Sequence, residues 1–188
     1  MPLKINRLSL LLAGTLILPS AALAGENFSY DFYEAEITST TEHGDSYVSL
    51  GASGSMELNN EHYITAMVKT DIGDDASANK IGIGIGAYKS SSESTDYYSR
   101  AGFTHGNDNC CGSAQTLSVG FGARHQLSDA IELTGGIDLL FSTAEESSGV
   151  SGNISALYNF DETKQIGAGV ESDGDKTEAR LFARMKML

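Results

Sequence analysis

The sequence predicts an all-β protein, a single antiparallel transmembrane β-barrel of ten strands that follows a cleaved signal peptide. Three observations predict this fold. The chain opens with a secretory leader, and the remainder alternates apolar with small or polar residues almost without interruption. Most of the alternating runs are close to the roughly 9–11 residues with which a tilted strand crosses the hydrocarbon layer. An eight-stranded barrel is the alternative if the run at 28–39 or the run at 165–172 is not a strand.

The leader occupies residues 1–24. Lys4 and Arg7 precede the apolar run LSLLLAGTLIL, and the segment ends in the small-residue pattern Ala22-Leu23-Ala24. A positive start, a short apolar stretch and such a cleavage site are typical of a secretory signal peptide. We therefore expect a signal peptide at 1–24 and one barrel domain at 25–188, exported through the periplasm to the outer membrane.

The composition after residue 24 limits the functional classes. This part of the chain holds 10 basic and 25 acidic residues, a formal net charge of −15, and it contains no proline. The negative charge argues against nucleic acid as a partner, because phosphates would be repelled. The sequence GIGIG at 82–86 lacks the spacing and the strand–helix context of a dinucleotide site, so we expect no cofactor.

The first predicted strand has an irregular pattern. Tyr30 and Phe32 share one phase of the alternation, whereas Tyr33, Ala35 and Ile37 share the other, so we expect a bulge near Phe32. The remaining runs alternate more regularly. All ten predicted strands are 28–39, 46–58, 62–71, 80–90, 96–105, 115–126, 131–143, 150–160, 165–172 and 177–187.

The two faces of these runs differ in kind. In 80–90, isoleucine occupies alternate positions from Ile81 to Ile85 and glycine fills the positions between them. The runs 46–58, 115–126, 131–143, 165–172 and 177–187 likewise set an aliphatic face against one of glycine, hydroxyl and charged residues. Aliphatic side chains facing lipid need no complementary packing, and glycine on the inner face leaves space for side chains arriving from across the barrel.

The links between the runs predict two different ends. Tight turns are expected at 58–61, 128–130 and 161–164, and longer loops at 40–45, 72–79, 106–114 and 144–149. Short periplasmic turns and longer external loops are typical of outer-membrane barrels, and an even strand number places both termini on the turn side. The links 90–95 and 173–176 fit this division less well.

The inward faces carry acids and bases in nearly equal numbers, which favours a salt-bridge network that plugs a narrow bore. The sequence therefore favours a structural or surface-interaction role. A narrow porin-like channel for small solutes is the alternative. A rim enzyme that uses His43 and His105 is a second alternative, but no motif spacing supports it. The predicted lumen network is Glu34, Glu36, Glu57, Lys69, Arg100, Arg124, Glu132, Asp138, Glu171, Glu178, Arg180 and Arg184.

The adjacent residues Cys110 and Cys111 lie in a predicted outer loop rich in Gly, Asn and Asp. Both thiols would pass through an oxidising periplasm. A vicinal disulfide that stiffens the loop is the first hypothesis, and intermolecular pairing or free thiols remain open.

Several segments resemble those of small outer-membrane barrels. They are Tyr30-Asp31-Phe32-Tyr33-Glu34, Ile81–Tyr88, Leu117–Arg124 with its Leu127-Ser128 turn, and Ala156-Leu157-Tyr158-Asn159-Phe160. The chain is similar to the OmpA/OmpX-like group, and more closely to gammaproteobacterial outer-membrane proteins of about this length. It departs from them by ending in Leu188 instead of Phe or Trp.

The resemblance implies a fold and a location, and no activity. An outer-membrane barrel implies outer-membrane lipid and lipopolysaccharide as partners, with periplasmic chaperones and the barrel assembly machinery during insertion. The sequence does not indicate an oligomeric state.

Overall fold

The computed structural model describes residues 28–59, 61–72, 78–108, 112–143 and 148–187. The predicted signal peptide at 1–24 and the pair Cys110 and Cys111 lie outside the described residues, so both remain predictions.

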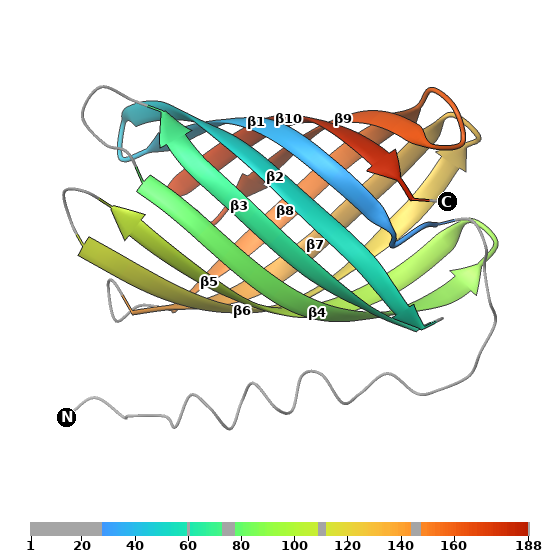
Figure 1. Ribbon diagram of the computed structural model, residues 1–188, viewed down its shortest axis with the longest axis horizontal. Helices are drawn as coiled ribbons and strands as arrows, with labels where there is room; N and C mark the ends of the chain where they lie inside the picture. Colours follow the sequence, from blue (N-terminus) through green and yellow to red (C-terminus); the bar gives the residue numbers. More distant parts are fainter. Residues whose placement is uncertain (1–27, 60, 73–77, 109–111, 144–147, 188) are drawn as a thin grey trace.

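Ten antiparallel strands form one closed barrel in which every strand pairs with its neighbours in the chain and β1 closes the circle by pairing with β10 (Figure 1). This confirms the predicted class and strand number over the eight-stranded alternative. The strands are β1 Phe32–Glu42, β2 Asp45–Asn59, β3 His62–Ile72, β4 Ala78–Ser92, β5 Thr95–Asp108, β6 Gly112–Ser128, β7 Ile131–Ser142, β8 Ser148–Asn159, β9 Lys164–Ser172 and β10 Lys176–Lys186.

The two ends of the barrel are named here by their connections. The turn end carries the links after β2, β4, β6 and β8, and the loop end carries those after β1, β3, β5, β7 and β9. Phe32 at the start of β1 pairs with Lys186 at the end of β10. Both ends of the described chain therefore lie at the turn end, as expected for an even number of strands.

The expected bulge near Phe32 is absent, because the register of β1 runs unbroken against both β2 and β10. Tyr30 and Phe32 share the inward phase, but Tyr30 precedes the strand and lies inside the barrel. Register shifts occur instead at the turn end, between Glu57 and Asn59, between Ser90 and Ser92 and between Gln126 and Ser128.

The expected contrast between short turns and long loops is also partly wrong. Residues 40–42 and 45–46 belong to β1 and β2, so that only His43 and Gly44 connect these strands. Both have positive φ values, 51° and 95°, as a two-residue hairpin turn requires. The two links that fitted poorly are short as well, with Glu93 and Ser94 between β4 and β5, and residues 173–175 between β9 and β10.

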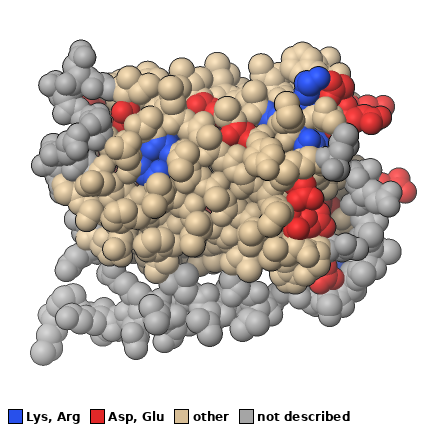
Figure 2. Space-filling model, in the orientation of Figure 1, with Lys and Arg blue, Asp and Glu red and all other residues tan. Residues whose placement is uncertain are grey.

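The outer wall is covered with large apolar side chains. Ile81, Ile83 and Ile85 are 49–68 % exposed, whereas Gly82 and Gly86 in the opposite phase are buried, as the alternation predicts. Most of the visible wall between the two ends consists of uncharged residues (Figure 2). No helix among the described residues is long and apolar enough to cross a bilayer.

Inward glycines accept side chains from the adjacent strand. Gly86 pairs with Tyr63, and Gly122 pairs with Tyr98, and a Cβ on either glycine would overlap the tyrosine ring. The rings therefore lie flat on the wall over their glycine partners. The prediction that glycine makes space was correct, but the space is filled from the next strand and not from across the barrel.

Candidate functional site: the barrel bore

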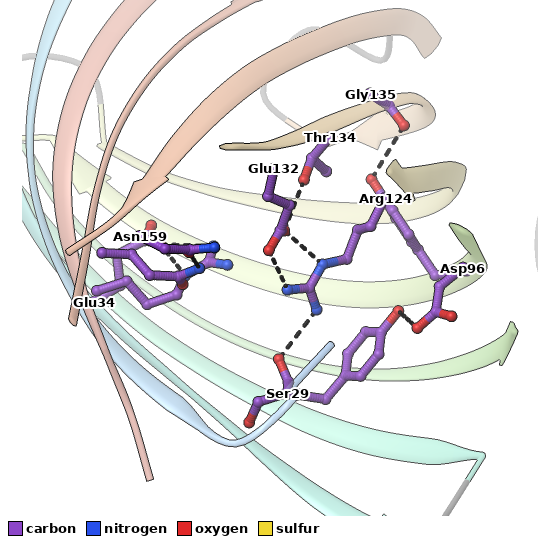
Figure 3. Close-up of polar contacts among 12 residues, drawn as sticks. Ser29, Glu34, Asp96, Arg124, Glu132, Thr134, Gly135 and Asn159 are labelled. Carbon is purple, nitrogen blue, oxygen red and sulfur yellow. Dashed lines mark hydrogen bonds and ion pairs between the residues drawn. The ribbon is translucent and has the colours of Figure 1, made fainter. Parts of the chain in front are cut away.

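The most buried ion pair of the bore joins Arg124 on β6 to Glu132 on β7. Nε of Arg124 donates to Oε1 of Glu132 at 2.8 Å, and Nη2 donates to Oε2 at 3.2 Å. The third nitrogen, Nη1, donates to the backbone carbonyl oxygen of Ser29 at 3.1 Å. Figure 3 shows Arg124 between the Glu132 carboxylate and Ser29. The barrel thus supplies one arginine that also binds the segment before β1.

That segment, residues 28–31, is held by aromatic contacts inside the barrel. The ring of Tyr30 stacks against two neighbouring rings, Tyr63 on β3 and Tyr88 on β4, with centroid distances of 4.7 and 3.9 Å. The Arg124 guanidinium lies 4.8 Å from the Tyr30 centroid and 4.9 Å from that of Phe28. Such cation–π contacts are strongest where water is excluded.

A second cluster lies on β1 and β10. Arg184 binds Glu34 with a 2.8 Å ion pair, and its guanidinium lies 4.0 Å from the Phe32 ring centroid. Arg180 lies between Glu34 and Glu36, at 3.7 and 3.5 Å. Two arginines and two glutamates therefore neutralise one another along neighbouring strands.

The opposite wall carries Arg100 on β5 and Asp138 on β7. Arg100 forms a two-bond ion pair with Asp138, in which Nε donates to Oδ1 at 2.8 Å and Nη2 donates to Oδ2. Asn153 on β8 also donates to Oδ2 of Asp138, at 3.1 Å. The side chains of Arg100 and Arg180 keep 42 % and 34 % of their surface exposed although both point inward. The bore is therefore hollow around these two arginines.

The turn-end half of the bore is filled. Six inward residues from six parts of the chain are buried there and form what we name the sealing layer. Four of them, Tyr30, Glu132, Leu157 and Phe182, are at most 3 % exposed. The sealing layer consists of Tyr30, Tyr63, Arg124, Glu132, Leu157 and Phe182.

The loop-end half is lined by lysines and acids. Glu178 on β10 binds Lys69 of β3 at 2.8 Å and Lys176 at 2.5 Å. Lys69 pairs across the strands with Lys80, and like charges directly opposite each other are destabilising. Asp71 offsets this repulsion, because it lies 3.7 Å from Lys80.

Two residues of the predicted network have hydroxyl partners instead of cationic ones. Glu57 accepts a hydrogen bond from Tyr88 at 2.5 Å, and Glu171 accepts one from Ser151 at 2.8 Å. The rest of the network lies in the ion pairs described above.

The predicted network left out three residues of the bore: Lys80, which begins the predicted strand 80–90, Lys176, which falls in the expected link 173–176, and Tyr30, which was assigned to a strand. The inward phase of the two lysines was the available signal.

The histidines of the rim-enzyme hypothesis are not brought together. His43 forms the β1–β2 turn, and His105 lies on β5, paired with Ile81 and Gln115. Within the described ranges, no group of three His, Cys, Asp or Glu side chains is placed to hold a metal ion.

Comparisons with known proteins find structural likeness alone. No family model matches the sequence, and neither does any curated protein. Among solved structures, the fold is similar to the KdgM porin, with a TM-score of 0.52 and 8 % identity over 82 % of this chain and 99 % of that one. It is also similar to the NanC porin, with a TM-score of 0.56 and 5 % identity over 81 % of this chain and 100 % of that one. At such identities the likeness establishes the barrel fold and nothing further.

Proposed function

We propose that the chain is an integral barrel of the bacterial outer membrane, closed at its turn end, with a structural or surface-interaction role. The exposed isoleucines support the location, because soluble monomers rarely expose apolar patches of more than a few hundred Å². A closed barrel also satisfies its backbone hydrogen bonds within lipid. The turn end would then face the periplasm.

The sealing layer is the observation that carries the closed state. Its members come from the segment before β1 and from β3, β6, β7, β8 and β10, so they cover the bore from several sides. We expect the purified protein to give no conductance steps in planar bilayers. Discrete, reproducible steps from the intact chain would contradict this function.

A narrow porin-like channel is the second candidate. The hollow around Arg100 and Arg180 favours it, since solvent has space in the middle of the bore. The porin names of two structurally similar proteins also suggest it. The same conductance measurement separates the two candidates.

A further inference from the structure

We propose that residues 28–30 form a displaceable seal, whose release converts the closed barrel into a narrow channel. This inference rests on the proposed function, because it takes the intact barrel to be closed. It adds the element that closes the barrel and the site that receives it.

The segment crosses the bore. It precedes β1, yet the carbonyl oxygen of Ser29 is bound by Arg124 on β6. In the closed order of ten strands, β6 is five strands from β1 in either direction. A segment bound at this position lies across the barrel and not along its own wall.

The receiving surface belongs to the barrel and is fixed without the segment. Two nitrogens of Arg124 are held by Glu132, which leaves the third for Ser29. Tyr88 is held by Glu57, and its ring is part of the aromatic surface against which Tyr30 stacks. A pre-arranged surface binds a segment at low entropic cost, and it persists when the segment leaves.

The segment is separate from the strand ladder. Ladder pairing of β1 begins at Phe32, and Asp31 is the last anchor before it. The carbonyl oxygen of Asp31 accepts a hydrogen bond from Met187 N at 2.9 Å, and its Oδ1 accepts one from Glu57 N at 2.5 Å. Residues 28–30 can therefore leave while these anchors and every paired strand stay in place.

Residues 28–30 are buried by non-covalent contacts that can form and break, as a displaceable seal requires. Phe28 and Tyr30 are 6 % and 3 % exposed, and their partners are aromatic rings and one arginine. The Tyr30 hydroxyl donates a long hydrogen bond, 3.4 Å, to Asp96. Among the described residues, no strand-ladder pairing holds residues 28–30.

The test compares refolded chains of residues 25–188 and 31–188 in planar bilayers, with heat-dependent gel migration as the check on folding. We expect the longer chain to be silent and the shorter one to conduct in discrete steps. The double variant Phe28→Ala/Tyr30→Ala keeps the chain length and should conduct as well. The matched control Tyr158→Ala/Phe160→Ala, which removes two exposed aromatic residues near the same end, should stay silent.

A synthetic peptide with the sequence of residues 25–31 should block the 31–188 channels when it is added from one side only. A folded 31–188 chain that gives no conductance would contradict the proposed seal but would still agree with the proposed closed barrel. Steps from the 25–188 chain would instead contradict the proposed function, and steps of the same size in both chains would overturn the seal too.

Discussion

The substitution Glu132→Ala examines the most buried ion pair directly. Glu132 and Arg124 have side chains only 1 % and 6 % exposed, and the substitution leaves the guanidinium charged, because arginine does not deprotonate in proteins. Removing one partner of a buried pair costs about 3–5 kcal/mol. Arg124 keeps its bond to Ser29 and its aromatic contacts. We therefore expect the lower end, a loss of about 3 kcal/mol in the free energy of unfolding.

Urea unfolding in lipid vesicles, followed by far-UV circular dichroism, measures this loss by linear extrapolation. The control is Lys164→Ala, which breaks the ion pair with Asp161 in the β8–β9 turn. Those side chains are 62 % and 48 % exposed, so the control should cost less than about 1 kcal/mol. Equal losses in the two variants would refute the view that the Arg124 pair lies in a dry, sealed layer.

Two further predictions concern the wall and a turn. Gly122→Ala should lower the unfolding free energy by about 1–3 kcal/mol, because the new Cβ would lie 2.5 Å from the carbonyl oxygen of Gly135. Gly152→Ala, whose Cβ meets nothing within 4 Å, is the control, and equal urea midpoints would contradict the packing account. The Thr163 hydroxyl and nearby backbone N–H groups donate to Asp161 and hold its pKa well below the usual value. The ionised Asp161 therefore stabilises the turn above the unfolded pKa, and this contribution is lost as the pH falls towards the folded pKa. Thr163→Val should raise that pKa in a carboxyl ¹³C NMR titration, and an unchanged pKa would show that the hydroxyl contributes nothing.

The strands were predictable because their alternation is a local property of the sequence. From Ile81 to Gly86, the residue type at each position indicates whether that position faces the exterior or the bore. The strand ends were not predictable in the same way. Thr40, Thr41 and Glu42 lie in β1 beyond the apolar belt, where polar strand residues have the same composition as a loop.

The bore was predictable in content but not in arrangement. Which acid binds which base depends on the register and on the distance across the barrel, and a single sequence carries neither. Leu157 and Phe182 are apolar residues on the inner face, and Tyr30 is a loop residue inside the barrel. Hydropathy cannot identify such residues as members of one layer, because each is buried by the others and they come from distant parts of the sequence.

The most direct test of the central claim, aliphatic side chains outward and small or charged ones inward, uses spin labels in lipid vesicles. One label replaces Ile83 on the outer face and another replaces Ser118 on the inner face, with Cys110 and Cys111 changed to serine. We expect the label at 83 to collide more with dissolved oxygen than with a water-soluble nickel complex, and the label at 118 to collide far less with oxygen. A label at 83 that meets the nickel complex more often than the label at 118 would contradict the account.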